Sequence, residues 1–334
     1  GAQALRGSWA WLADRAKEAP VGASWPTCKW PAPIQALGSA AISGYVEALA
    51  DVLMESGLPA YTLELLATLR HAVVAQYGED GGRQLPRIVP LVQRLAHGKY
   101  RKSAEEGRGS RLVTAELEGL DAPDPFVEVA SLRGPLLCSS APALLEELQA
   151  SEATLSSQQW EPSEARSALG ALGHDGRAET PASWSMGLVE QGLWTAGGRF
   201  PEARRVLATL GLPPSAVGFV RMPPHGEAQL HQEGANYLIT ILLCLDAHGV
   251  AHCGDWSREV RAGEALVFEQ TFTHRIENRS GSCLHALCCH VFHPEVSDVE
   301  RFALLLLRLL LDVVRSTDAY RQFTMLPEGA DPEL

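Results

Sequence analysis

The feature that most restricts the fold of this chain is a series of short apolar segments in its second half. From Trp184 onward these segments follow one another at intervals of roughly ten residues, separated by Gly, Pro, Asn and Asp. They read AVGFVRM, YLITILLCLD, VAHCGDW, EALVFEQ and CLHALCCHVF. Short strands joined by turn residues at this spacing are typical of an antiparallel sandwich or barrel, and the mouth of such a barrel can hold one small ligand.

The part of the chain before these strands has a helical pattern. Within residues 9–102, apolar residues recur three or four positions apart, and Gly and Pro residues supply the stops between helices. The polar, Gly-containing stretch 101–111 is the predicted linker. We therefore predict a helical N-terminal region at 1–120 and a strand-containing domain at 121–334.

The composition excludes several classes of protein. The net charge of -12 argues against a nucleic-acid partner, because phosphate contacts need clustered Lys and Arg. Seven cysteines without a CxxC pair fit neither a disulfide framework nor a structural zinc site. We therefore expect reduced thiols and an intracellular location, cytoplasmic or organellar. The sequence contains no phosphate-binding loop, dinucleotide fingerprint or GxSxG elbow.

The most apolar segment is FALLLLRLLLDVV, at 302–314. Arg308 and Asp312 interrupt it, and it is shorter than the roughly 20 residues that a membrane span requires. We predict that it belongs to a buried helix at about 298–315, whose leucines cover one face of the sheet, and not to a membrane span.

The stretch LHQEGANYL places His231 and Glu233 at the start of a strand-like segment. Residues two apart on a strand point to the same face, so both side chains can reach one ion. The later stretch FEQTFTHRIEN supplies His274 after another strand. Two imidazoles and a carboxylate with open positions favour non-haem Fe(II) in oxygen chemistry. The spacing alone leaves a second interpretation open, in which these are ordinary polar residues near strand ends.

Three separated stretches around these residues resemble the aspartyl/asparaginyl β-hydroxylase family. They are GFVRMPPHGEAQLHQEGANYLITILLCLD, GEALVFEQTFTHRIENRSG and HVFHPEVS, and together they span about 218–297. In the family the corresponding motifs read PG…PHxGxTN…LRxHLxL, GExxxFDDSFxHExWN and WHPxL. The matching positions here are Gly226, His231, Asn236, Gly263, Glu264, Phe268, Phe272, His274, Asn278, His293 and Pro294.

The resemblance implies an α+β protein with a double-stranded β-helix barrel, which is jelly-roll or cupin-like, packed against helices. It also implies an Fe(II)- and 2-oxoglutarate-dependent dioxygenase that hydroxylates a protein, peptide or small-molecule substrate. By this resemblance His231 and His274 are iron ligands and Asn236 lies in the cofactor-binding region. The family has glycine where this chain has Glu233, which is therefore either a third metal ligand or a solvated turn residue.

The sequence departs from the family where 2-oxoglutarate binds. Leu284 stands at the position of the arginine that holds the distal carboxylate, and a neutral side chain cannot form that bidentate pair. Thr240 and Leu242 likewise replace an arginine and a histidine that help to bind the cosubstrate.

Three interpretations follow from these departures. In the first, Arg221 or His285 faces inward and replaces the lost cation. Only one of Leu284 and His285 can face the interior, because a strand alternates. In the second, the protein binds iron but uses a different cosubstrate or none. In the third, the barrel is catalytically degenerate and serves as a binding or structural subunit. His290, farther along the same apolar strand, is expected to be a hydrogen-bonded core histidine.

Overall fold

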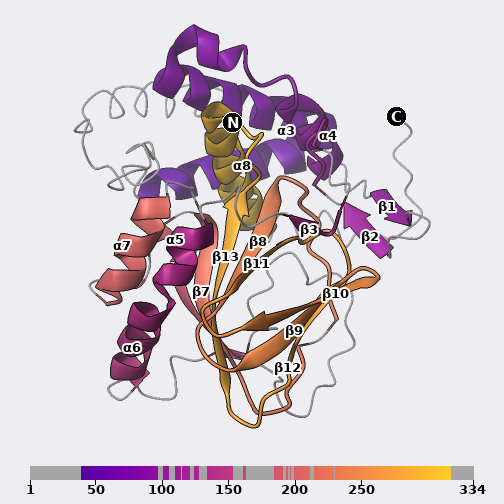
Figure 1. Cartoon of the computed structure of the whole chain (residues 1–334). Helices are drawn as coiled ribbons and strands as arrows, with labels where there is room; N and C mark the ends of the chain where they lie inside the picture. The colour runs from indigo at the N-terminus through magenta and orange to yellow at the C-terminus, as the bar shows by residue number, and fades with distance from the viewer. Residues whose placement is uncertain are drawn as a thin grey trace. The chain divides into compact units, whose positions relative to one another are not determined.

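Figure 1 shows the computed structural model of the chain. It describes residues 39–96, 101–104, 110–113, 115–120, 124–127, 134–152, 161–162, 184–190, 193–194, 196, 199–210, 214–228 and 230–316. The helical prediction for 9–38 lies outside these residues. The chain divides into two compact units, and the described residues of the first are 39–96 and 296–316, whereas those of the second lie between 101 and 295.

The first unit is helical. Its described helices are α3 (Ser39–Gly82), α4 (Ile88–Ala96) and α8 (Asp298–Ser316). α3 is interrupted at Gly57 and Gly78, where φ is 75°. A residue with a Cβ atom rarely adopts this conformation, so glycine allows the chain to turn there. Among the described helices, none has the length and apolar character that crossing a membrane requires.

Helix α8 packs against α3 and α4 within this unit. The rings of Tyr77 and Phe302 meet edge-on, with centroids 5.8 Å apart. Arg87 donates to both carboxylate oxygens of Glu300 at 2.7 Å. Ser297 and Glu300 bond to each other's backbone N–H groups and so form a capping box at the start of the helix. The compact units therefore differ from the predicted boundaries at 1–120 and 121–334, because these contacts group α8 with the N-terminal helices.

The second unit contains all the strands found among the described residues. They are β1 (Arg101–Ala104), β2 (Ser110–Val113), β3 (Phe126–Val127), β4 (Glu161–Pro162), β5 (Trp184–Glu190), β6 (Leu193–Trp194), β7 (Pro214–Met222), β8 (Leu238–Cys244), β9 (His248–Cys253), β10 (Trp256–Arg261), β11 (Ala265–Glu269), β12 (His274–Asn278) and β13 (Leu284–Phe292). The large sheet has the order β3-β11-β8-β13-β7-β5-β4, with β6 beside β5, and the small sheet has the order β10-β9-β12. β1 and β2 pair with each other in a separate antiparallel sheet, and β1 and the first half of β2 lie in the stretch predicted as a linker.

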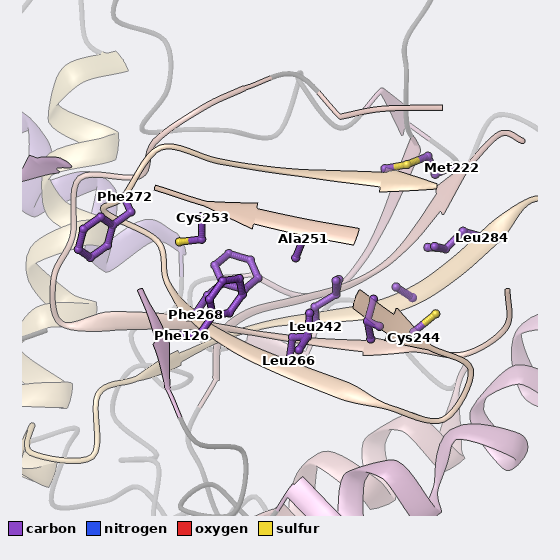
Figure 2. Packing of buried hydrophobic residues seen from close by; sticks show 12 residues of the cluster. Phe126, Met222, Leu242, Cys244, Ala251, Cys253, Leu266, Phe268, Phe272 and Leu284 are labelled. Atoms are coloured by element: carbon purple, nitrogen blue, oxygen red, sulfur yellow. The ribbon is translucent and has the colours of Figure 1, made fainter. Parts of the chain in front are cut away.

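Alternate residues of the large and small sheets point into one apolar interior, shown in Figure 2. The interior cluster consists of Phe126, Met222, Leu242, Cys244, Ala251, Cys253, Val260, Leu266, Phe268, Phe272, Leu284 and Ala286. Because its members come from both sheets, the sheets face each other across it. Two facing antiparallel sheets with packed helices confirm the predicted α+β class and its double-stranded β-helix barrel.

Three helices accompany the large sheet: α5 (Gly134–Ser139), α6 (Ala141–Glu152) and α7 (Pro201–Leu210). They lie on one side of the unit beside β7 (Figure 1). The carboxylate of Glu147 on α6 accepts hydrogen bonds from the backbone N–H groups of Glu202 and Ala203 at 2.7 and 2.9 Å. These donors have no partner within a helix, so Glu147 stabilises the start of α7.

Candidate metal centre

His231 and His274 are direct antiparallel partners. The backbone N–H of His231 donates to the carbonyl of His274 at 3.1 Å, and the reverse bond measures 2.8 Å. Partners in such a pair carry their side chains on the same face. The ring centroids are 4.2 Å apart. The fold thus brings together two imidazoles from distant parts of the sequence.

The imidazole of His274 is held in one tautomer. Its Nδ1 lies 2.8 Å from the carbonyl oxygen of Phe272, which can only accept, so Nδ1 carries the proton. The unprotonated nitrogen is therefore Nε2. Burial, reinforced by the nearby His231, lowers the pKa of His274 to about 3. A neutral imidazole whose other nitrogen donates to a backbone carbonyl is the usual state of a metal-binding histidine.

Glu233 lies beside this pair but leans toward His290. Its backbone N–H donates to the carbonyl of Gln270 at 2.9 Å, and its Oε2 is 3.5 Å from Nδ1 of His290. Glu233 raises the pKa of His274 whereas His290 lowers it, so the three groups interact electrostatically. Within the part of the chain that the structure describes, no three His, Cys, Asp or Glu side chains are arranged to hold a metal ion. The histidine pair is thus the element of the centre that is already formed.

The interior is polar at one end and apolar at the other. At the polar end, His290 of β13 is the strand partner of Thr240 of β8. At the apolar end, Ala286 of β13 is the strand partner of Cys244 of β8. Nδ1 of His290 lies 3.0 Å from Oε1 of Gln270 and 3.2 Å from Oγ1 of Thr240. The side-chain amide of Gln270 donates to the carbonyl of Ala235 at 3.3 Å. These polar groups adjoin the histidine pair, and the apolar cluster continues away from it.

Asn236 has a structural role. Its Oδ1 accepts from the N–H of Leu117 at 2.7 Å, and its Nδ2 donates to the carbonyl of Leu117 at 3.0 Å. The side chain is 3% exposed. Asn236 therefore pairs with a backbone peptide in the way a neighbouring strand would, and this pairing engages both polar atoms of its side chain.

The structure places Arg221 and His285 on the outer face of the large sheet, which corrects the expectation that one of them faces inward. They are strand partners of each other. Arg221 forms an ion pair with Glu152 at 3.6 Å, and Nδ1 of His285 lies 2.7 Å from Oδ2 of Asp246. The alternation of β13 turns Leu284 into the interior instead, where it is 2% exposed.

The donor set suits a divalent metal better than it suits 2-oxoglutarate. Two imidazoles with a nearby carboxylate are ligands that Fe(II) accepts. At the family's arginine position, however, Leu284 packs in the apolar cluster with Met222 and Leu242. A carboxylate placed there would lose its hydration without gaining a cation. The described residues therefore do not fit the distal carboxylate of 2-oxoglutarate.

The contact between His290 and Glu233 was not predicted from the sequence. His290 was expected to be a hydrogen-bonded core histidine, and it bonds to Thr240 and Gln270 at the polar end of the interior, but its Nδ1 also lies 3.5 Å from the Glu233 carboxylate. The period of two along β13 was the available signal, because it places His290 on the same face as Leu284. The sequence did not show which face was the inner one.

The fold and the histidine pair define a double-stranded β-helix domain with a candidate metal centre. Residues 140–294 match the model of the family described as Aspartyl/Asparaginyl beta-hydroxylase. The match includes His231, Glu233 and His274, confirms the resemblance found in the sequence and is consistent with a divergent family member. The family match and the fold together support a dioxygenase-like hydroxylase in general.

Other comparisons are less informative. No curated protein matches the chain. Among solved structures, a predicted oxalate decarboxylase from Thermotoga maritima is 18% identical, with 33% of this chain and 81% of that chain covered and a TM-score of 0.25. The cupin domain of Cnp3 from Schizosaccharomyces pombe is 11% identical, with 36% and 74% covered and a TM-score of 0.25. The Cupin_2 domain of an XRE family transcriptional regulator from Enterobacter cloacae is 11% identical, with 24% and 82% covered and a TM-score of 0.22.

Proposed function

We propose that this domain is a metal-dependent hydroxylase in which His231 and His274 hold one Fe(II) and Glu233 supplies a third ligand. The observation that supports the proposal most strongly is the hydrogen-bonded pairing of the two histidines, with ring centroids 4.2 Å apart. Two imidazoles and a carboxylate leave coordination positions for substrate and O2. Bound Fe(II) would supply the activation of O2.

The residues of the chain then have separate tasks. The carbonyl of Phe272 fixes the tautomer of His274, so that Nε2 presents its lone pair. The reciprocal backbone bonds keep His231 beside His274. The backbone N–H of Glu233 donates to Gln270, which keeps Glu233 near the histidine pair, and its carboxylate would balance part of the charge of a divalent ion.

Binding of the cosubstrate 2-oxoglutarate has less support from these residues than binding of the metal. Leu284 and its apolar neighbours occupy the region where the family binds a carboxylate. We therefore assign iron to the centre and derive no step that uses 2-oxoglutarate. The packed interior also favours a second candidate function, in which the barrel is catalytically degenerate and serves as a binding or structural subunit.

Anaerobic calorimetry with Fe(II) discriminates between the two candidates. A hydroxylase centre should bind one Fe(II) per chain, and His231→Ala or His274→Ala should weaken binding by more than the roughly 10- to 100-fold typical of an outer-shell partner. His252→Ala is the matched control, because His252 is also a strand histidine but pairs with Glu277. If the wild-type protein binds no Fe(II), the hydroxylase proposal is wrong and the degenerate barrel is favoured.

A second measurement tests the cosubstrate. The iron-loaded protein is mixed with O2 and 2-oxoglutarate, and succinate is quantified. We expect no succinate above the level of the His274→Ala variant. Succinate formation that depends on His274 would show that the domain uses 2-oxoglutarate despite Leu284.

A further inference from the structure

Strand β10 lies at one edge of the small sheet, whose order is β10-β9-β12. Its residue Val260 belongs to the interior cluster and is fully buried. Trp256 and Arg258 lie on the same face of the strand as Val260, because residues two apart point to one face, yet both are exposed. The interior is therefore covered at the Val260 end of β10 and open to solvent at the Trp256 end.

Trp256 belongs to the row of strand partners that contains the histidine pair. His231 is the partner of His274, and His274 is in turn the partner of Cys253. Cys253 is also the partner of Trp256. Residues directly opposite each other share a face, so all four side chains lie on the inner face of the small sheet. This row leads from the histidine pair to the open edge of the sheet.

Arg258 differs from the other arginines of the small sheet and its surroundings. Arg261, Arg275 and Arg279 each form an ion pair with a glutamate. Arg258 instead stacks over the ring of Phe126 of β3, 4.8 Å from its centroid, and within the described part of the chain it has no acidic partner. The ring orients the guanidinium without neutralising it. In a chain with a net charge of -12, the charge of Arg258 thus remains available to an anionic group.

The outer edge of β10 also offers backbone groups. The N–H of Arg261 donates to the carboxylate of Glu264 and its carbonyl accepts the N–H of Glu264, so the backbone of Arg261 faces away from β9. Because an antiparallel ladder alternates, the N–H and C=O groups of Ser257 and Glu259 also face away from β9. Among the described residues, no strand pairs with this edge. Such an edge is where an extended peptide can add as a further strand.

We propose that the edge of β10 at 256–259 binds an extended acidic peptide as an added antiparallel strand. A carboxylate of the peptide lies on Arg258, and an apolar side chain two residues farther along the peptide lies on Trp256. The antiparallel direction is the one in which β9 pairs with both of its neighbours. Trp256 is 40% exposed at a sheet edge, a setting that fits an added strand better than the enclosed pocket that a small molecule requires.

The peptide strand lies apart from the histidine pair. It is three strand spacings from His274, or about 14 Å, so its acidic residue is a recognition element and not the reacting residue. Only the role of this peptide as part of a substrate rests on the proposed function. Its binding to the edge needs no metal.

The test uses metal-free protein and two immobilised libraries of blocked heptapeptides, with a central aspartate or a central asparagine between randomised positions. The wild-type protein should retain on the aspartate library and select apolar residues two positions after the aspartate. Arg258→Met keeps a stem over Phe126 and should bind a selected peptide about 10-fold more weakly, the loss expected for one hydrogen bond to a charged group. Trp256→Ala should lose the apolar selection. Arg261→Met is the matched control and should bind like the wild type, because Arg261 lies on the opposite face of the same strand.

Amide hydrogen exchange then locates the peptide on the protein. Addition of a selected peptide should slow exchange at Ser257 and Glu259, whose N–H groups would pair with the added strand.

Three results would each overturn the proposal: equal retention on the two libraries, unchanged affinity in Arg258→Met, or no slowing of exchange at Ser257 and Glu259. Binding to vesicles of phosphatidylserine and phosphatidylcholine that depends on Arg258, without retention on either library, would show that the edge contacts an anionic membrane and not a peptide. Peptide binding by a protein that binds no Fe(II) would leave this recognition surface in place and remove only the hydroxylase proposal, so the two failures can be distinguished.

Discussion

Leu284 of β13 is the direct strand partner of Met222 of β7, and both side chains lie in the apolar interior (Figure 2). Because strand partners carry their side chains on the same face and Met222 lies in the interior, the face of β13 that carries Leu284 is the inner one. This register therefore places His285 outside, against Asp246. The region that the family uses for the carboxylate of a cosubstrate is part of the hydrophobic core here.

Truncating this core position should be costly. Leu284→Ala removes a side chain that is 2% exposed, and we expect it to lower the free energy of unfolding by about 2–5 kcal/mol through lost burial and a residual cavity. Urea denaturation measures this loss. The control is Leu230→Ala, because Leu230 is 54% exposed and its truncation should change stability by no more than about 0.5 kcal/mol. A similarly small cost at Leu284 would mean that the interior is open and not packed.

Glu269 should make stability depend on pH. Burial raises the pKa of its carboxyl to about 7 from an ordinary value of 4.5, although Arg111 and Thr271 oppose the shift. Between these pH values the unfolded chain has released the proton and the folded protein retains it, so stability falls as pH rises. The variant Glu269→Gln has no ionisable group at this position, so it should gain stability relative to the wild type as pH rises. The difference in the free energy of unfolding, variant minus wild type, should be about 1–3 kcal/mol larger at pH 8 than at pH 4. A difference that is the same at both pH values would contradict the buried, protonated carboxyl.

Asn236 should affect stability and not metal binding. Asn236→Ala leaves the peptide N–H and carbonyl of Leu117 without their side-chain partner, which should cost about 1–3 kcal/mol. Asn236→Asp should cost at least as much, because a carboxylate oxygen would face the Leu117 carbonyl. Thermal unfolding and Mn(II) titration of the same samples separate the two effects. Weaker metal binding with unchanged stability would restore the cofactor-binding role predicted from the sequence.

In the helical unit, Arg87 and Glu300 should be strongly coupled. Glu300 is 4% exposed and receives two bonds from Arg87, each 2.7 Å long. Burial alone would raise the pKa of Glu300, but Arg87 and Ser297 outweigh it and lower that pKa. Arg87→Met should cost about 2–4 kcal/mol because it leaves a buried carboxylate unpaired. The double variant Arg87→Met with Glu300→Gln should lose less than the sum of the single variants in urea denaturation, and simple additivity would argue against the pair.

The main strands could be predicted because they are buried and continuous in apolar character. Strands β8 and β11 lie within the predicted segments YLITILLCLD and EALVFEQ, and every residue of both strands is buried. The stretch 101–111 was predicted as a linker, yet β1 and part of β2 form a hairpin in it. Its polar residues are equally suitable for a loop and for a solvated hairpin, so composition does not separate the two.

The candidate centre was predictable only in part. The two histidines were identified from the ordered family motifs, because spacing alone does not show that residues 231 and 274 converge. The inward direction of Leu284 depends on which face of β13 meets the small sheet, and a one-residue shift would have exchanged it with His285. The contact between Glu233 and His290 depends on side-chain conformations that no sequence pattern encodes.

Pulsed EPR of the Mn(II)-loaded protein tests the central claim most directly, because it detects the imidazole nitrogens bound to the ion. We predict couplings from two imidazoles in the wild-type protein and in His252→Ala, and the loss of one coupling in either His231→Ala or His274→Ala. Bound Mn(II) without imidazole coupling, or with couplings that persist unchanged in both single variants, would show that these two histidines do not form the metal centre.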